Sequence, residues 1–214
     1  MMKKILVMMM ALMMMFSLAA CGGNNDTTTE ASTEAPTEAP TEAPELAYKS
    51  AEELLKLLMD SYNATAAEEA KLYVCGGNIN NFDTTNPEGP AAFVALEDAD
   101  FDTNLGYPTA DVAKQDDTAS MFNMMNVNVF NCYAVHFTNS ADVDAMADTI
   151  KENILNRQWI CGSPEKLVIA KMPGDYLVVV WGAVEFGGIV DPFTASFADS
   201  VEGSSIVVEH TFAQ

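Results

Sequence analysis

The chain has 214 residues, a formal charge of −21 and a hydrophobic content of 49%. A surface this acidic cannot neutralise phosphates with a basic stripe, so we expect no nucleic-acid partner. The charge favours cationic partners only in a general way, and its simplest role is to keep a protein soluble beside an anionic cell envelope.

Residues 1–20 have the layout of a secretory signal. Two lysines, Lys3 and Lys4, precede an apolar run from Ile5 to Phe16 that ends in small residues before Cys21. The run is too short to span a hydrocarbon core of ~30 Å comfortably, which argues against a transmembrane helix.

The segment Leu18-Ala19-Ala20-Cys21 resembles the bacterial lipobox. In that motif the cysteine receives a diacylglyceryl group and the chain is cut before it. The resemblance implies a signal peptide over 1–20, a lipid on Cys21 and attachment to the extracytoplasmic face of the cell membrane. An ordinary secretory signal is the alternative. Cleavage would remove two lysines and no acid, which lowers the charge from −21 to −23.

Residues 21–46 predict a disordered stalk. The tetrapeptide Thr-Glu-Ala-Pro occurs three times, from Thr33, Thr37 and Thr41, and the segment has no apolar side chain larger than alanine before Leu46. Such a segment cannot bury enough surface to offset the entropy of ordering, and its prolines and like charges keep it extended. Residues 47–214 are expected to form a single domain.

Three cysteines follow Cys21, at Cys75, Cys132 and Cys161. An odd number leaves at least one thiol unpaired, and the spacings fit no zinc pattern. We interpret them as small buried hydrophobic side chains, with a bridge between Cys132 and Cys161 left open.

The first part of the domain is expected to be helical. Ser50 and Glu53 form a capping-box pattern ahead of four leucines, which predicts a helix ending near residue 61. A second helix is predicted over 64–74. Residues 78–108 are rich in Asn, Asp, Gly and Pro, which predicts a long surface connection, and Asp111 is expected to cap a short helix reaching about residue 121.

The second part alternates strands and helices. The apolar stretch 127–137 predicts a central strand, and the pattern over 140–157 predicts a helix with Ser140 as its N-cap. Apolar runs over 166–172 and 176–184 flank Pro173-Gly174, which predicts a hairpin. A helix from residue 191 to Gly203 and a last strand over 205–212 complete the series.

This order of elements predicts an α+β fold. Residues 127–214 are expected to form a ferredoxin-like βαββαβ sheet, with the N-terminal helices packed on it. In that topology the last strand pairs with the first, so His210 would lie near Phe130. His136 and His210 would then be roughly 20 Å apart at ~3.3 Å per residue, which argues against a shared metal site.

Several segments resemble uncharacterised lipoproteins of clostridial bacteria, in the family called domain of unknown function 4358. They are Met124–Val127, Val135–Phe137, Gln158–Gly162 and Gly174–Val178. The likeness spans about residues 50–185. It implies a Gram-positive exported lipoprotein, and it carries no catalytic residue to this sequence.

One acidic segment suggests a calcium loop. Asp100, Asp102, Asn104 and Asp111 occupy positions one, three, five and twelve, where such loops place oxygen ligands. Position six is Leu105 instead of glycine, and position twelve is aspartate instead of glutamate. The alternative interpretation is a solvated acidic loop.

The aromatic residues Trp159 and Trp181, with Tyr176 and Phe186, are candidates for a ligand surface, although core packing is the commoner role. The sequence contains no Gly-x-Ser-x-Gly elbow, and we predict no catalytic residue and no cofactor other than calcium.

The leading hypothesis is a non-enzymatic binding or adaptor domain, tethered to the membrane through Cys21, that binds a protein or envelope component. The alternatives are a receptor for calcium or a small ligand and an envelope hydrolase.

Overall fold

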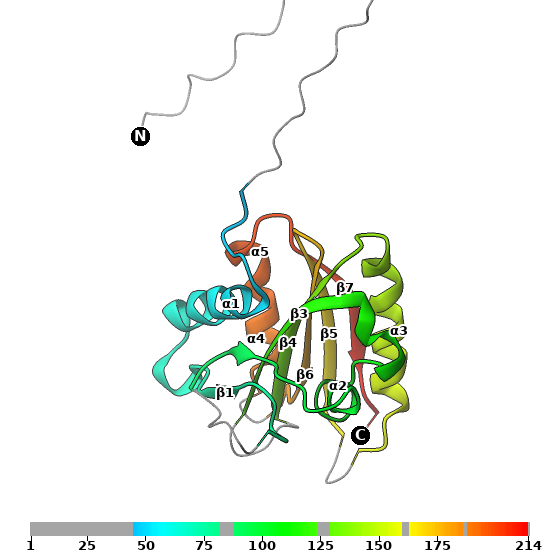
Figure 1. The fold of residues 1–214 in the computed structure, drawn as a ribbon. Helices are drawn as coiled ribbons and strands as arrows, with labels where there is room; N and C mark the ends of the chain where they lie inside the picture. The colour runs from blue at the N-terminus through cyan, green and yellow to red at the C-terminus, as the bar shows by residue number, and fades with distance from the viewer. Residues whose placement is uncertain (1–44, 82–87, 124–128, 160–162, 186–187, 214) are drawn as a thin grey trace, which may run out of the picture. The chain divides into compact units, whose positions relative to one another are not determined.

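The structure is a computed structural model that describes residues 45–81, 88–123, 129–159, 163–185 and 188–213. Within these ranges, no helix is both long and apolar enough to cross a membrane. The elements, drawn in Figure 1, are α1 (Ala51–Thr65), η1 (Glu68–Ala70), β1 (Val74–Gly76), β2 (Ala91–Ala92), α2 (Ala99–Leu105), η2 (Thr109–Lys114), β3 (Gln115–Asn123), β4 (Phe130–Phe137), α3 (Asp142–Asn156), β5 (Lys166–Met172), β6 (Tyr176–Gly182), α4 (Val190–Ala195), α5 (Phe197–Ser200) and β7 (Ser205–Thr211).

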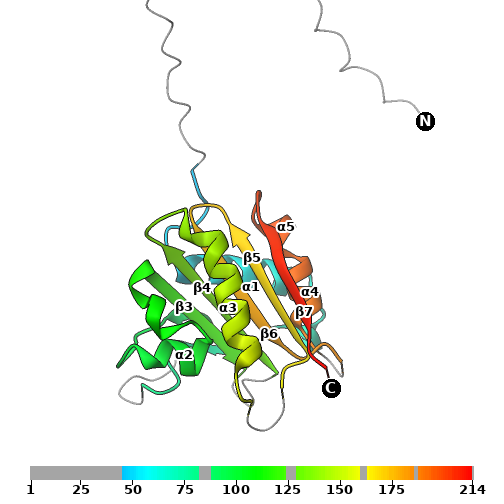
Figure 2. The same cartoon turned by 90° about the vertical axis from the view of Figure 1, so that its right-hand side faces the viewer.

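Seven strands within these ranges form one antiparallel sheet. Its order is β1-β3-β4-β6-β5-β7, and the short β2 also pairs with β3. Helix α3 crosses one face (Figure 2), while α1, α4 and α5 cover the other (Figure 1). The predicted α+β class is therefore confirmed.

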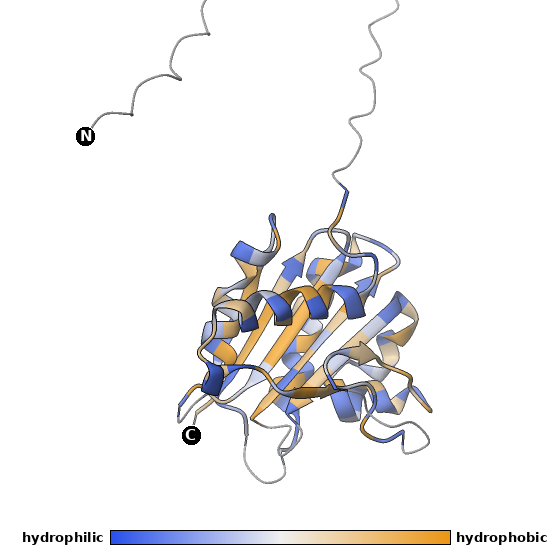
Figure 3. Cartoon of the chain, turned by 90° about the vertical axis from the view of Figure 1, so that its left-hand side faces the viewer, coloured by the Kyte–Doolittle hydropathy of each residue, from blue (hydrophilic) through white to orange (hydrophobic). Residues whose placement is uncertain are grey.

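Alternate residues of β4 supply two separate cores. Phe130, Cys132 and Ala134 pack on the side of α1, whereas Tyr133 and Val135 pack on the side of α3. Successive side chains of a strand point to opposite faces, so a strand that is apolar throughout belongs in the middle of a sheet covered on both sides. Figure 3 shows the hydrophobic central strands of the sheet behind α1. The prediction of a central strand at 127–137 is confirmed over Phe130–Phe137, and residues 127 and 128 lie outside the described residues.

The first helix is capped as predicted, since Ser50 Oγ accepts a hydrogen bond from the Glu53 backbone N at 3.1 Å. The helix predicted over 64–74 is wrong. Apart from the last two residues of α1, only η1 is helical there, and the chain then extends into β1, where Val74 pairs with Asn123 of β3. Pairing with a distant strand outweighs the local helix propensity of the alanines and glutamates.

The region before β4 differs most from expectation. The helix predicted from Asp111 to about residue 121 is wrong, because η2 ends at Lys114 and β3 follows. Asp111 does not cap a helix; its carboxylate pairs with Lys114 Nζ at 2.8 Å. Residues 115–123 become a strand because β1 and β2 pair with them on one side and β4 on the other. Helix α2 also lies within the stretch predicted to be an irregular connection.

The hairpin between β5 and β6 is confirmed. Gly174 and Asp175 both have a positive φ, 77° and 64°, which suits a tight turn between antiparallel strands. The start of the domain packs at this hairpin, where the Tyr48 hydroxyl donates to the Pro173 carbonyl at 2.6 Å. The cap predicted for α3 is wrong, because Ser140 makes no side-chain cap and Asn139 Oδ1 instead accepts from the Ala141 backbone N at 3.1 Å.

The last strand departs from the ferredoxin-like arrangement. The order β4-β6-β5 agrees with that topology, but β7 pairs with β5 instead of β4, so the predicted pairing of the first and last strands is wrong. The edge of β4 is already occupied by β3, which pairs with it from Gln115 to Phe122. Phe193 and Phe197 bury α4 and α5 on the α1 face, and the chain returns to the open edge of β5.

Candidate functional site

A small pocket that is open to solvent lies at the end of the sheet where β4 begins and β6 ends. Both tryptophans of the chain line it. The other lining residues come from the loop after β1, from the end of α2, from β3 and β4, and from the segment after α3: Gly77, Ile79, Thr103, Asn104, Leu105, Ser120, Phe122, Asn131 and Arg157.

Three neighbouring strands form the base of this pocket. Trp181 of β6 lies opposite Asn131 of β4, and Asn131 lies opposite Phe122 of β3, so the three side chains share the face of α3. Trp181 is 1% exposed and Asn131 is 5% exposed. The ends of α2 and α3 bring Asn104, Arg157 and Trp159 to the same place.

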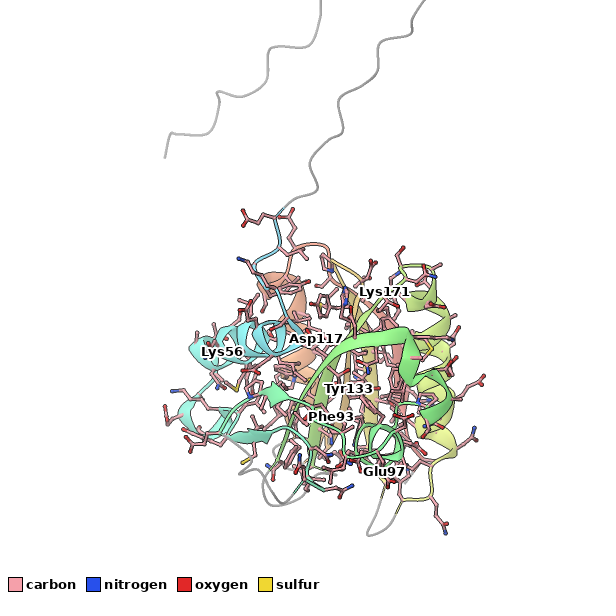
Figure 4. The ribbon with its side chains drawn as sticks, in the orientation of Figure 1. Lys56, Phe93, Glu97, Asp117, Tyr133 and Lys171 are labelled. Carbon is pink, nitrogen blue, oxygen red and sulfur yellow. The ribbon has the colours of Figure 1, made fainter. Side chains whose placement is uncertain are left out.

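The aromatic rings at this end of the sheet contact one another. The ring centroids of Trp159 and Trp181 are 6.2 Å apart, and Trp181 lies 6.1 Å from Tyr133, which Figure 4 labels in the centre of the sheet. The structure therefore brings together the two tryptophans predicted from the sequence. Tyr176, predicted beside them, lies at the opposite end of β6 against Tyr48, and Phe186 is outside the described residues.

Four polar atoms of the lining residues are buried without a hydrogen-bond partner. They are Asn104 Oδ1, Asn131 Oδ1, Arg157 Nη1 and Trp159 Nε1. Leaving a buried polar group unpaired costs about 1–3 kcal/mol each, so such groups are rare and call for an explanation. Their concentration in one pocket, with both tryptophans, makes this the candidate binding site.

Arg157 is the only arginine of the chain. Its Nη2 donates to the Thr103 carbonyl, and its guanidinium carbon lies 4.9 Å from the centroid of the Trp159 ring. No carboxylate of the described residues forms an ion pair with it. Burial lowers the pKa of Arg157, and the nearby Asp102 carboxylate opposes this only in part. Within the part of the chain that the structure describes, the guanidinium therefore lines the pocket without an ion-pair partner.

The four residues of the predicted calcium loop have separate contacts. The buried Asp100 carboxylate accepts hydrogen bonds from the Leu96 backbone N at 2.7 Å and from Asn78 Nδ2 at 2.8 Å. Asp102 accepts from Asn153 at 2.7 Å, Asp111 pairs with Lys114, and Asn104 lines the pocket.

The predicted loop is in fact helix α2 with the turn that follows it, so the oxygens do not surround one centre. Among the described residues, no group of three or more His, Cys, Asp or Glu side chains is arranged to hold a metal ion. The calcium hypothesis therefore lacks the loop geometry on which it depended, and it stays a prediction for measurement.

The histidines lie apart, although the strand pairing that suggested this was wrong. His136 Nδ1 lies 2.5 Å from Asp116 Oδ1, whereas His210 pairs with Leu167 on the far edge of the sheet. Three strand spacings and five residues separate them, which again corresponds to roughly 20 Å.

The cysteines offer no activated nucleophile among the described residues. Cys75 and Cys132 are both buried free thiols, and burial raises the pKa of Cys132 well above its usual value. A thiol in such surroundings is inert, because the thiolate is the reactive form. Cys161, whose bridge to Cys132 the sequence left open, lies outside the described residues.

Sequence reasoning missed Asn131 and Arg157 as pocket residues. Two signals were present: an amide in the middle of an apolar strand, and a single arginine in a very acidic chain. Comparison with protein-family models, with curated proteins and with solved structures finds no match to this chain. The function is therefore argued from the pocket itself.

Proposed function

We propose that this protein is a lipid-anchored extracytoplasmic binding domain, and that it binds a small polar ligand in the pocket lined by Trp159 and Trp181. The observation that carries the proposal is that four residues lining that one pocket each have a buried polar atom without a partner among the described residues. Small-ligand sites combine apolar and aromatic walls with a few polar groups that orient the ligand, which is the composition found here.

The lining residues favour binding over catalysis. Among the described residues that line the pocket there is no histidine, carboxylate, lysine or cysteine, so these residues offer no general base for a hydrolytic reaction. The hydroxyls of Ser120 and Thr103 donate to the carbonyls of Gly77 and Ala99 instead of to a base. These features support a receptor over an envelope hydrolase.

The anchor in this proposal depends on the lipobox resemblance at Cys21. A diacylglyceryl group supplies two acyl chains, which hold a protein at a membrane far more firmly than a single chain does. A stalk over residues 21–46 would then keep the pocket at high effective concentration near the membrane, so that a ligand of modest affinity is captured there.

An adaptor role is the second candidate, and a group of exposed apolar side chains supports it. Ile79, Val94 and Leu96 are 43%, 57% and 62% exposed. Their two segments lie together, because Asn78 Nδ2 donates to the Val94 carbonyl at 3.1 Å. Crosslinking on intact cells should capture one stoichiometric envelope protein, and Leu96→Ser should abolish the capture if this group is the interface. Unchanged capture by that variant would exclude the group as an interface.

The two tryptophans make the ligand test direct. Because both line the pocket, tryptophan fluorescence of the full-length protein, excited selectively over its tyrosines, reports on the pocket. Titration with pools of amino acids, monosaccharides and organic acids should give a saturable change with at least one pool, together with a higher melting temperature.

Asn131→Leu should abolish the response, whereas the exposed α1 variant Lys56→Gln should keep it. The proposal fails if no pool changes fluorescence or melting temperature, or if Asn131→Leu binds as tightly as the parent.

A further inference from the structure

The unpaired guanidinium of Arg157 indicates the charge of the ligand. Five described lysines pair with carboxylates, namely Lys56, Lys71, Lys114, Lys166 and Lys171. Arg157 does not, although the chain carries a formal charge of −21. A planar guanidinium is well suited to carboxylate oxygens, and Arg157, whose buried Nη1 has no hydrogen-bond partner among the described residues, lines the pocket. The acceptor that completes it must come from outside the described protein.

The remaining unpaired atoms define a complementary pattern. Arg157 Nη1 and Trp159 Nε1 are hydrogen-bond donors, whereas Asn104 Oδ1 and Asn131 Oδ1 are acceptors. A ligand that satisfies all four must carry acceptor oxygens on one part and N–H or O–H donors on another. A simple anion without N–H or O–H groups, such as acetate, would leave both asparagine oxygens unpaired.

Charge balance narrows the choice further. Arg157 is the single cationic side chain of the lining, and Asp102 lies close enough to affect its pKa. A dianion would therefore be poorly neutralised within a strongly acidic protein. A molecule with one carboxylate and one ammonium group has no net charge, and one with a carboxylate and an amide N–H carries a single negative charge that Arg157 alone can balance.

We propose that the pocket binds an α-amino acid, free or as the C-terminal residue of a peptide. The carboxylate contacts Arg157 and Trp159, and the N–H groups contact Asn104 and Asn131. Apolar lining from Ile79, Leu105, Phe122 and Trp181 selects an apolar side chain. This inference depends on the proposed binding function and specifies its ligand.

The decisive probes differ by single groups. L-leucine and L-phenylalanine should each give saturable quenching or enhancement of tryptophan fluorescence in the full-length protein, whereas the corresponding amino-acid amides, which lack the carboxylate, should bind at least about tenfold more weakly. N-acetyl-leucine keeps the carboxylate and one N–H. Its binding at equal or higher affinity would indicate a peptide C-terminus, and its failure to bind would indicate a free amino acid. Glucose and inorganic phosphate serve as probes of the competing chemistries.

The variants test the contacts one at a time. Arg157→Gln should weaken binding of the amino acid about tenfold or more, and Trp159→Phe, which keeps a ring but removes the N–H donor, about three- to tenfold. Each substitution should weaken binding of the amino-acid amide less than binding of the amino acid, because the amide has no carboxylate to contact Arg157 and Trp159. Lys56→Gln is the matched surface control. If Arg157→Gln fails to fold, the affinities of the amino acid and its amide for the unsubstituted protein still test whether the pocket recognises the carboxylate.

The outcomes distinguish the amino-acid inference from the proposed binding function of the pocket. Binding of glucose or phosphate that depends on Asn131, without binding of any amino acid or N-acetyl amino acid, would overturn the amino-acid inference and keep the pocket as a binding site. Equal affinity for acids and amides would also overturn it. If no probe binds, both the amino-acid inference and the proposed binding function are wrong.

Discussion

Two polar clusters lie near each other on the same side of the sheet, and they are built in opposite ways. One surrounds the Asp100 carboxylate, whose oxygens accept hydrogen bonds from Leu96 N, Asn78 and Asn80. The other is the tryptophan pocket, whose Asn104 lies one helical turn further along α2. Asn104 Nδ2 donates to the Asp100 carbonyl at 3.0 Å, yet its Oδ1 has no partner. Fully paired burial serves the fold, whereas unpaired burial costs stability and is retained at functional sites.

The largest effect expected from this contrast is on stability at the paired cluster. Asp100→Ala removes the acceptor of Leu96 N and Asn78 Nδ2 and leaves both donors buried, which should lower the free energy of unfolding by about 2–4 kcal/mol. Urea denaturation followed by circular dichroism measures this. Lys171→Ala is the control, because its ion pair with Asp144 is exposed and should contribute less than about 1 kcal/mol. Equal effects of the two substitutions would contradict a structural role for Asp100.

Acid should weaken the same cluster. Burial alone would raise the pKa of Asp100, but the hydrogen bonds from Leu96, Asn78 and Asn80 outweigh it and lower the pKa below its usual value. The folded state therefore binds a proton less readily than the unfolded state. The stabilisation is complete above the unfolded pKa of about 3.9 and is lost as the pH falls through the lower folded pKa.

Asp100→Asn cannot titrate, so its free energy of unfolding should fall less steeply between neutral and strongly acid pH than that of the parent protein. Denaturation curves over that range measure the difference. Parallel pH profiles for the two proteins would show that Asp100 does not titrate as proposed.

Substitution of an unpaired polar residue in the pocket should not lower the free energy of unfolding. Asn131→Leu replaces a buried amide whose Oδ1 is unpaired by an apolar side chain of similar size, so the free energy of unfolding should stay the same or rise by about 1 kcal/mol. Ligand binding should be lost at the same time. A matched control is Thr194→Val, which removes a buried hydroxyl that donates to the Val190 carbonyl and should cost about 1 kcal/mol. Destabilisation by Asn131→Leu would mean that the amide is structural.

The smallest effect is expected from calcium. Because Asp100, Asp102 and Asp111 are engaged in separate contacts, millimolar calcium should leave the melting temperature of the full-length protein unchanged. A ligand that binds only the native state must raise that temperature. A rise that Asp100→Asn abolishes would restore the calcium hypothesis.

The sequence predicted the C-terminal half well because its signals are local. The hairpin at Pro173-Gly174, the amphipathic helix α3 and the apolar strands β4 and β6 each follow from a short pattern. The partner of β7 did not follow from such a pattern, since it depends on β3 occupying the edge of β4. Residues 115–123 are only weakly apolar at their start, and their strand conformation comes from pairing on both sides.

The pocket could be predicted only in part for the same reason. The two tryptophans were recognisable as candidate ligand contacts, because their size and indole N–H suit recognition. Asn131, Arg157 and Asn104 meet only when β4, α3 and α2 are assembled, and nothing in the spacing of these residues shows that their polar atoms will lack partners. Asn104 was predicted as a metal ligand for its oxygen, and that oxygen is the atom now unpaired.

The attachment of Tyr48 to the Pro173 carbonyl also has a mechanical consequence. The chain enters the domain at the hairpin end of the sheet, near Lys171, whereas α2 and the pocket lie at the other end, near Glu97 (Figure 4). Five residues of β6 separate Tyr176 from Trp181, which corresponds to about 17 Å. A force applied at residue 45 therefore acts on the hairpin between β5 and β6. It does not act directly on the residues that line the pocket. If the protein is anchored as proposed, lengthening or shortening the Thr-Glu-Ala-Pro repeats should change the reach of the domain and leave its ligand affinity unchanged.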